Sequence, residues 1–180
     1  MYKLLIISLL SIIFFSCKNE ENTSQNDCPF GEPRPILIEN AAGVSNYKFE
    51  VNGQNSIETA FIEDSFLMTK KINFTLLQSG CESIKQEYRF ELPPANYSEL
   101  VDSFFVQRAA EGLKVVAERN PQAADSFIPN FAFDLFYSAG NVPLNQPLPV
   151  DSQTAPGLLF VVRKIANKQE GIVSVEFLNE

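Results

Sequence analysis

Residues 66–92, FLMTKKINFTLLQSGCESIKQEYRFEL, hold two stretches of alternating apolar and polar residues with a turn between them. The side chains on the apolar face are Ile72, Phe74, Leu76, Ile84, Tyr88, Phe90 and Leu92, and those on the opposite face of the second stretch are Lys85, Glu87, Arg89 and Glu91. A two-residue period is that of a β-strand with one buried and one wetted face, and Gln78-Ser79-Gly80 has the composition of a turn. The pattern predicts an antiparallel hairpin of residues 66–77 and 83–92 within a half-exposed sheet.

Strand patterns continue on both sides of this hairpin. The further predicted strands are Ile36–Glu39, Tyr47–Val51, Ile57–Ile62, Leu158–Ile165 and Ile172–Leu178. Asn52-Gly53 is a strong hairpin turn, because both residues tolerate a positive φ, and residues 167–171 join the last two strands. The chain therefore has enough strands for a sheet of about six or seven.

One long helix is predicted between the two groups of strands. Pro93-Pro94 ends the sheet, and Asn96 followed three residues later by Glu99 has the spacing of a capping box at a helix start. The helix is expected to run to about Glu118, ahead of a proline.

Two segments lack a decisive period. Residues 122–137 suit either a short helix or a strand, and residues 141–156 carry several prolines and are expected to form a long ordered loop or lid. The order of elements predicts one α+β domain over residues 28–180, an antiparallel sheet with the long helix packed on one face.

Composition excludes several classes of function. The 180 residues are 45% hydrophobic and 20% charged, as in a folded protein, and the net charge of −8 opposes binding to nucleic acid or anionic lipid head groups. The chain has no histidine, which excludes Ser-His-Asp and Cys-His nucleophilic sites. With no calcium-loop or glycine-rich phosphate motif, no metal and no cofactor is expected.

The N-terminus carries a short positive start, an apolar run over Leu4–Phe15 and then Ser16-Cys17. As a helix, the twelve residues of this apolar run would be about 18 Å long, which is too short to span a bilayer. The segment resembles a bacterial lipoprotein signal peptide. That resemblance implies removal of residues 1–16, acylation of Cys17 with palmitate-like chains, and anchoring in the outer membrane of a Gram-negative bacterium, facing the periplasm or the surface. Polar residues follow, so residues 17–27 are expected to be a disordered tether.

Two cysteines remain for the domain. An exported chain meets an oxidising compartment, so Cys28 and Cys81 are predicted to form one disulfide, which would contribute about 4 kcal/mol on the chain-entropy model. The alternative is a pair of buried free thiols.

The apolar arc of the predicted helix, counted at 100° per residue from Leu100, includes Phe104, Val115, Val101 and Phe105, and Arg108 falls in its middle. A guanidinium buried without an acceptor would be heavily penalised, so a partner is required. Gln86 and Asp134 interrupt apolar patterns elsewhere and are the candidate partners. Either the three form a structural network that orients the helix, or residues 141–156 cover a pocket in which Arg108 binds a ligand carboxylate.

These observations favour a non-catalytic, lipid-anchored envelope protein with a binding or accessory role, whose partner is a protein or a small molecule. A second hypothesis is an inhibitor of a basic hydrolase such as lysozyme, because an acidic protein is steered electrostatically toward a basic one. A third is a hydrolase that uses carboxylates alone.

Overall fold

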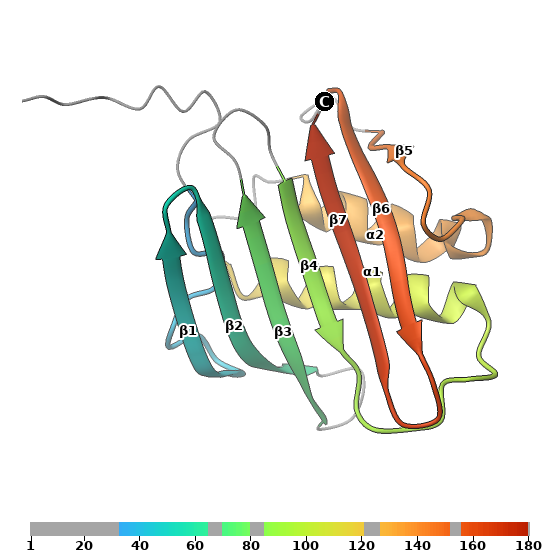
Figure 1. The fold of residues 1–180 in the computed structure, drawn as a ribbon, viewed down its shortest axis with the longest axis horizontal. Helices are drawn as coiled ribbons and strands as arrows, with labels where there is room; N and C mark the ends of the chain where they lie inside the picture. Colours follow the sequence, from blue (N-terminus) through green and yellow to red (C-terminus); the bar gives the residue numbers. More distant parts are fainter. Residues whose placement is uncertain (1–32, 65–69, 80–84, 121–126, 152–155, 180) are drawn as a thin grey trace, which may run out of the picture.

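The computed structural model describes residues 33–64, 70–79, 85–120, 127–151 and 156–179, which form a sheet of seven strands and two α-helices (Figure 1). The elements are β1 (Val44–Asn52), β2 (Asn55–Asp64), β3 (Lys70–Ser79), β4 (Lys85–Glu91), α1 (Asp102–Glu118), α2 (Ile128–Ser138), the 3-10 turn η2 (Ala139–Asn141), β5 (Leu148–Pro149), β6 (Leu158–Ala166) and β7 (Gly171–Asn179). The strand order is β1-β2-β3-β4-β7-β6-β5, and every neighbouring pair is antiparallel. The predicted α+β class and antiparallel sheet are confirmed.

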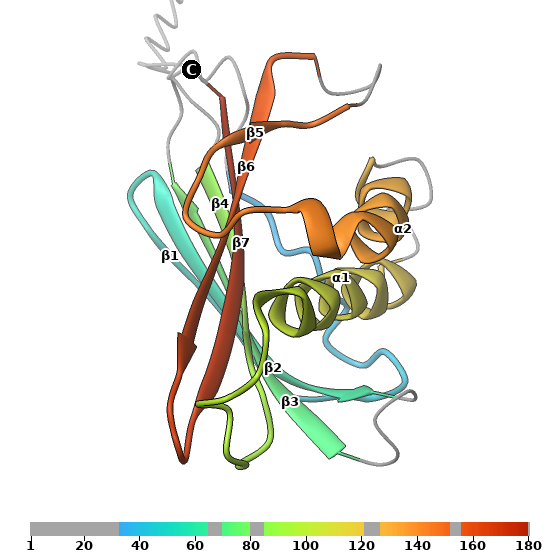
Figure 2. The same ribbon diagram turned by 90° about the vertical axis from the view of Figure 1, so that its right-hand side faces the viewer.

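Both helices pack on one face of the sheet, and the other face is open (Figures 1 and 2). The apolar face of the predicted hairpin is the one that meets the helices. Its buried members in the described residues are Ile72, Phe74, Leu76, Tyr88, Phe90 and Leu92. β4 pairs with β7, so that the strands before the helices and the strands after them in the sequence join into one sheet. The alternating pattern in the sequence therefore marked the core face correctly.

The helical layer differs from the prediction in two respects. A second helix, α2, lies beside α1 on the same face, in the segment that suited either a helix or a strand (Figure 2). α1 begins at Asp102 rather than near Asn96, because the Asn96 carboxamide accepts hydrogen bonds from the backbone N–H and hydroxyl of Ser98 and closes a local turn instead. The predicted strand Ile36–Glu39 is irregular chain.

A glycine allows α1 to approach the sheet closely. A Cβ atom at Gly112 would lie 2.7 Å from two ring carbons of Phe90, a side chain on β4 with only 1% of its surface exposed. Ordinary carbon contacts are about 3.5–4.0 Å, so a larger residue would not fit at this distance. Gly112 therefore sets the spacing between α1 and the sheet.

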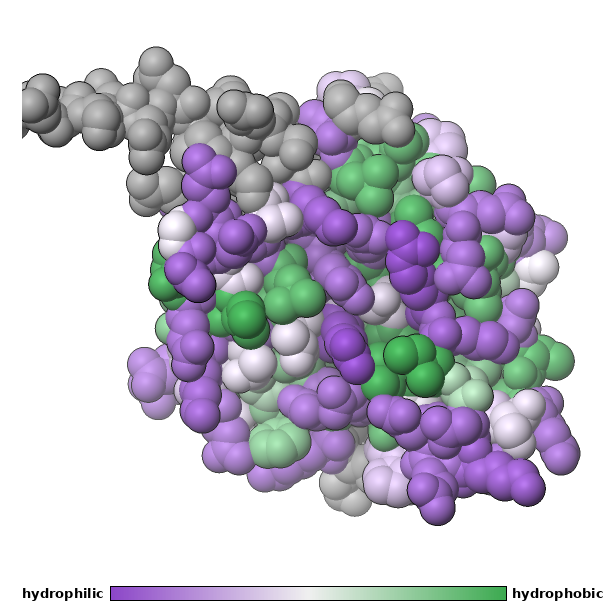
Figure 3. Space-filling model, in the orientation of Figure 1, coloured by the Kyte–Doolittle hydropathy of each residue, from purple (hydrophilic) through white to green (hydrophobic). Residues whose placement is uncertain are grey.

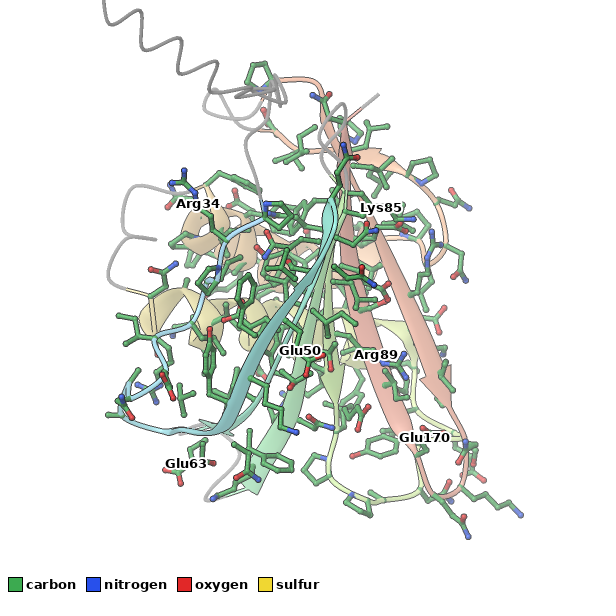
Figure 4. All side chains as sticks on the ribbon, turned by 60° about the vertical axis from the view of Figure 1, so that its left-hand side comes forward. Arg34, Glu50, Glu63, Lys85, Arg89 and Glu170 are labelled. Carbon is green, nitrogen blue, oxygen red and sulfur yellow. The ribbon has the colours of Figure 1, made fainter. Side chains whose placement is uncertain are left out.

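The open face of the sheet mixes charges with small apolar patches (Figure 3). Ile57 and Ile165 are 47% and 53% exposed on this face. Glu176 on β7 accepts from Lys85 at 2.9 Å and from Arg163 at 2.7 Å. Burial alone would raise the pKa of Glu176, but hydrogen bonds and charge from the two cations outweigh it, and the pKa is lowered. Figure 4 shows Lys85 on β4 among the charged side chains that line the sheet.

Candidate functional site

The three polar residues that the sequence grouped together do not meet in the fold. The Nη2 atom of Arg108 donates to Oε1 of Glu111 at 2.7 Å, and its Cζ lies 5.3 Å from the ring centre of Phe104. Gln86 lies on β4, in hydrogen bonds with other side chains, and Asp134 is exposed on α2. The predicted Arg108–Gln86–Asp134 network is therefore wrong. The alternative, a ligand carboxylate bound by Arg108, stays a prediction, and Arg108 is not among the described residues that line the two hollows presented below.

The error comes from the choice of residues that defined the apolar arc. Leu100 and Val101 were counted, but both precede α1 and are exposed. The side chains of α1 that are buried are Phe105, Val106, Ala109, Ala110, Gly112, Leu113, Val115 and Val116. At about 100° per residue, the middle of that set lies roughly a quarter of a turn from Arg108. Arg108 is thus at the edge of the buried face, where its Nη2 pairs with Glu111 of the same helix, while its buried Nε has no hydrogen-bond partner among the described residues.

Gln86 belongs to a buried polar cluster on the core side of β2, β3 and β4. Its Nε2 donates to Oε1 of Gln78 at 3.3 Å, and the Tyr88 hydroxyl donates to its Oε1 at 3.3 Å. The Nε2 of Gln78 donates to the backbone carbonyl of Arg34 at 2.7 Å. The cluster therefore connects the sheet to the N-terminal segment 33–38, which crosses its core face.

Glu58 on β2 holds the same segment and is wholly buried, with 0% exposure. Its carboxylate accepts from the backbone N–H of Ile36 at 2.8 Å and of Leu37 at 2.7 Å, and from the Tyr47 hydroxyl. Burial raises the pKa of Glu58, although these hydrogen bonds oppose the shift. Burial and the charge of Glu58 raise the pKa of Tyr47 to about 12. Burial and the charge of Glu58 also raise the pKa of Tyr88.

Glu58 was not among the residues predicted to matter, although a signal was present. It has the strand parity of Ala60 and Ile62, so this carboxylate shares one face of the predicted strand Ile57–Ile62 with two apolar residues. The two carboxylate oxygens of Glu58 are buried and accept hydrogen bonds from main-chain N–H groups, so Glu58 anchors residues 36–37. With 0% of its surface exposed, it offers no surface to a substrate.

An exposed aromatic pair marks the outer side of α2. Ile128, Phe131 and Leu135 of this helix are buried against the core, whereas Phe133 is 63% exposed and Tyr137 73% exposed. The two exposed rings lie with their centres 4.6 Å apart. We call this pair the α2 ridge.

Two hollows flank the α2 ridge, and Phe133 lines both. The α1–α2 hollow has a volume of about 660 Å³ and an apolar lining that includes Ala110, Ala132 and Phe136. The α2–β5 hollow has a volume of about 600 Å³, and its floor includes the buried residues Phe131, Val150 and Phe160. Both volumes fall in the range of sites for small molecules or for inserted side chains.

The rims of the two hollows differ in charge. Glu111, Lys114 and Glu118 line the α1–α2 hollow, and Lys114 pairs with Glu118 at 3.9 Å. The charged residues that line the α2–β5 hollow are Asp134 and Asp151, both exposed. Asp134, expected to hold Arg108, thus belongs to an acidic rim. This surface was not foreseen, because its members come from α2, β5 and β6.

The remaining expectations concern metals, membranes and the cysteines. Among the described residues, no cluster of three His, Cys, Asp or Glu side chains is arranged to hold a metal ion. In the same part of the chain, no helix has both the length and the apolar character needed to span a bilayer. Cys17, Cys28 and Cys81 lie outside the described residues, so acylation and the disulfide stay predictions.

Comparison of the chain with protein-family models, with curated proteins and with solved structures finds no match. Function is therefore inferred from the surfaces of this molecule.

Proposed function

We propose that this protein is a non-catalytic binding module of the bacterial envelope, anchored by lipid at Cys17, which docks a partner on the α2 ridge. The observation that carries the proposal is the exposed, paired placement of Phe133 and Tyr137 between two apolar hollows. Large aromatic side chains next to concave apolar surface are typical of the centres of protein interfaces.

The energetics favour a use for this surface. Each large aromatic side chain buries about 150–250 Å² when fully covered, and apolar area contributes about 25 cal/mol per Å². The neighbouring Phe131 and Phe136 are packed into the domain. The exposed rings of Phe133 and Tyr137 lack that stabilisation as long as they face water. A partner that covers both rings would recover it.

The anchor and the missing imidazole support the same proposal. The segment that ends at Cys17 resembles a lipoprotein signal, and the polar residues 18–27 after it would act as a leash. A chain with no histidine lacks the side chain most often used for acid–base catalysis. A domain held at a membrane on a flexible leash is suited to capture a partner.

Site-specific photo-crosslinking in the envelope of living cells tests the proposed surface. A photoreactive amino acid at position 133 or 137 is expected to give one discrete adduct. The same amino acid at Ile57 or Ile165 supplies the control, because these residues are similarly exposed but lie on the open sheet face. Adducts of equal yield at all four positions, or none at 133 and 137, would overturn the assignment of the surface.

Anchoring is tested separately by the Cys17→Ser variant. This variant is expected to leave the detergent-extracted membrane fraction, because the acyl chains that hold the protein are absent. Retention of the variant in that fraction would refute the lipid anchor.

A second candidate function, inhibition of a basic hydrolase such as a lysozyme, is favoured by the net charge of −8 and by the acidic rim of the α2–β5 hollow. Purified protein would then slow a basic lysozyme in low salt, and the Phe133→Ala variant would slow it less. Equal hydrolysis with and without the protein would remove this candidate.

A further inference from the structure

The α2–β5 hollow combines an aromatic floor with an acidic rim. Phe131 and Phe160 lie in its floor with ring centres 4.8 Å apart, and each has only 7–8% of its surface exposed. Asp134 and Asp151 stand at its rim, and none of the described residues that line it is a lysine or an arginine. Within the described lining, these carboxylates therefore have no cation of the same hollow to neutralise them.

Such a hollow selects a ligand that is apolar and positively charged at once. Phenyl faces attract cations through the ring quadrupole and also bury aliphatic carbon. Carboxylates at the rim add attraction for an ammonium or guanidinium and repel anions. Lysine and arginine side chains have this composition, an aliphatic stem that ends in a cation.

A phenyl ring and a carboxylate also hold a lysine side chain within this chain. The Nζ atom of Lys164 lies 4.7 Å from the ring centre of Phe105 and 2.5 Å from Oδ1 of Asp102. A phenyl ring and an aspartate therefore already hold one ammonium of this chain. The α2–β5 hollow presents the same two kinds of group, and its described lining contains no lysine or arginine.

We infer that the α2–β5 hollow receives a lysine or arginine side chain of the protein that docks on the α2 ridge, with an adjoining apolar residue of that protein packed on Phe133. This inference rests on the proposed function and adds the chemistry of the partner. The position of Phe133, which lines both hollows, joins the two contacts into one surface.

Charge complementarity favours a basic partner over a second copy of this chain. A second copy would bring an identical acidic surface and a net charge of −8 against Asp134 and Asp151. Like charges placed face to face oppose association, whereas a basic protein is attracted from a distance in low salt.

Three short peptides whose flanking residues are basic, neutral or acidic test the inference. The probes are acetyl-Lys-Phe-Lys-amide, acetyl-Gln-Phe-Gln-amide and acetyl-Glu-Phe-Glu-amide, titrated into the full acylated chain in non-ionic detergent micelles. Amide chemical shifts of Asp134, Asp151 and Phe160 report binding at the hollow. In low salt, we expect the lysine peptide to bind about threefold to tenfold more tightly than the glutamine peptide, as exposed ion pairs allow, and the glutamate peptide to bind least.

Two variants distinguish attraction by the rim carboxylates from attraction by the net negative charge of the protein. Asp134→Asn combined with Asp151→Asn is expected to reduce binding of the lysine peptide to the level of the glutamine peptide, because the rim carboxylates are gone. Glu118→Gln removes the same charge from the rim of the other hollow and is expected to preserve the preference. High salt should remove the preference as the double variant does.

Several results would overturn the inference. These are equal binding of the lysine and glutamine peptides, no binding of any peptide, or a preference that persists in the double variant. Shifts at the hollow that depend on protein concentration without peptide would assign the surface to a second copy. If the peptides show no preference while crosslinking at position 133 gives a discrete adduct, the inference fails and the proposed function stands. If the lysine peptide is preferred but crosslinking gives no adduct, the proposed function fails.

Discussion

Replacing Gly112 with alanine tests whether this glycine sets the distance between α1 and the sheet. The new Cβ would lie 2.7 Å from two carbons of the Phe90 ring, about 1 Å closer than an ordinary contact. The ring cannot move freely, because it is 1% exposed and lies 5.6 Å, centre to centre, from the ring of Phe74. The substitution therefore forces α1 or β4 to shift.

The expected magnitude is a balance of two opposing effects. Overpacking a well-packed core costs about 1–3 kcal/mol, and the confined Phe90 ring places Gly112→Ala in the upper part of that range, at about 2–3 kcal/mol. Exchanging glycine for alanine inside a helix returns about 1 kcal/mol. We expect Gly112→Ala to lower the free energy of unfolding by about 1–2 kcal/mol, and the melting temperature by about 2–8 °C for a domain of this size. Urea unfolding followed by far-UV circular dichroism measures this difference.

Two further variants make the test specific to the contact. Gly140→Ala is the control, because no atom lies within 4 Å of its added Cβ, and its free energy of unfolding should stay within about 0.5 kcal/mol of the parent. Phe90→Leu should cost less in the Gly112→Ala background than alone, with a coupling of at least about 1 kcal/mol. A Gly112→Ala protein as stable as the parent, or a coupling near zero, would refute the reasoning.

Three more predictions concern charges and cysteines. The folded-state pKa of Glu58 is raised above the ordinary value of 4.5, because burial disfavours the ionised carboxylate. Glu58→Gln should therefore gain stability relative to the parent as the pH rises above 4.5, and a difference in urea unfolding that stays constant with pH would contradict this. The pKa of Glu176 is lowered, so the free energy of unfolding of the parent should exceed that of Glu176→Gln by about 1 kcal/mol at pH 7. This difference should vanish as the pH falls below 4.5, and a difference that is unchanged at pH 3 would contradict the prediction. Intact mass with and without reductant should show one Cys28–Cys81 disulfide, and two cysteines freely alkylated in the native protein would exclude it.

Local periodicity determined the sheet. The alternation in residues 72–76 and 88–92 placed the correct side chains in the core. The turn predicted at Asn52-Gly53 lies one residue further along, because Asn52 pairs with Asn55 and leaves Gly53 and Gln54 as the loop, with a positive φ of +62° at Gly53. Such patterns can be recognised in a sequence because neighbouring residues of a strand alternate between faces wherever the strand lies in the fold. The absence of histidine, the acidic charge and the lipoprotein-like N-terminus are likewise properties of the chain itself.

Tertiary structure alone decided the polar partners and the candidate binding surface. Glu58 meets main-chain donors 21 and 22 residues away. Arg108 pairs with Glu111 at the edge of the buried face, because that face is formed by residues within α1 and does not include Leu100 and Val101, which precede the helix. The α2–β5 hollow brings Asp134 on α2 near residues 149–151 and Phe160. Helix phase and contacts between distant elements depend on how these elements pack together, and a periodicity that repeats every two to four residues carries no record of that packing.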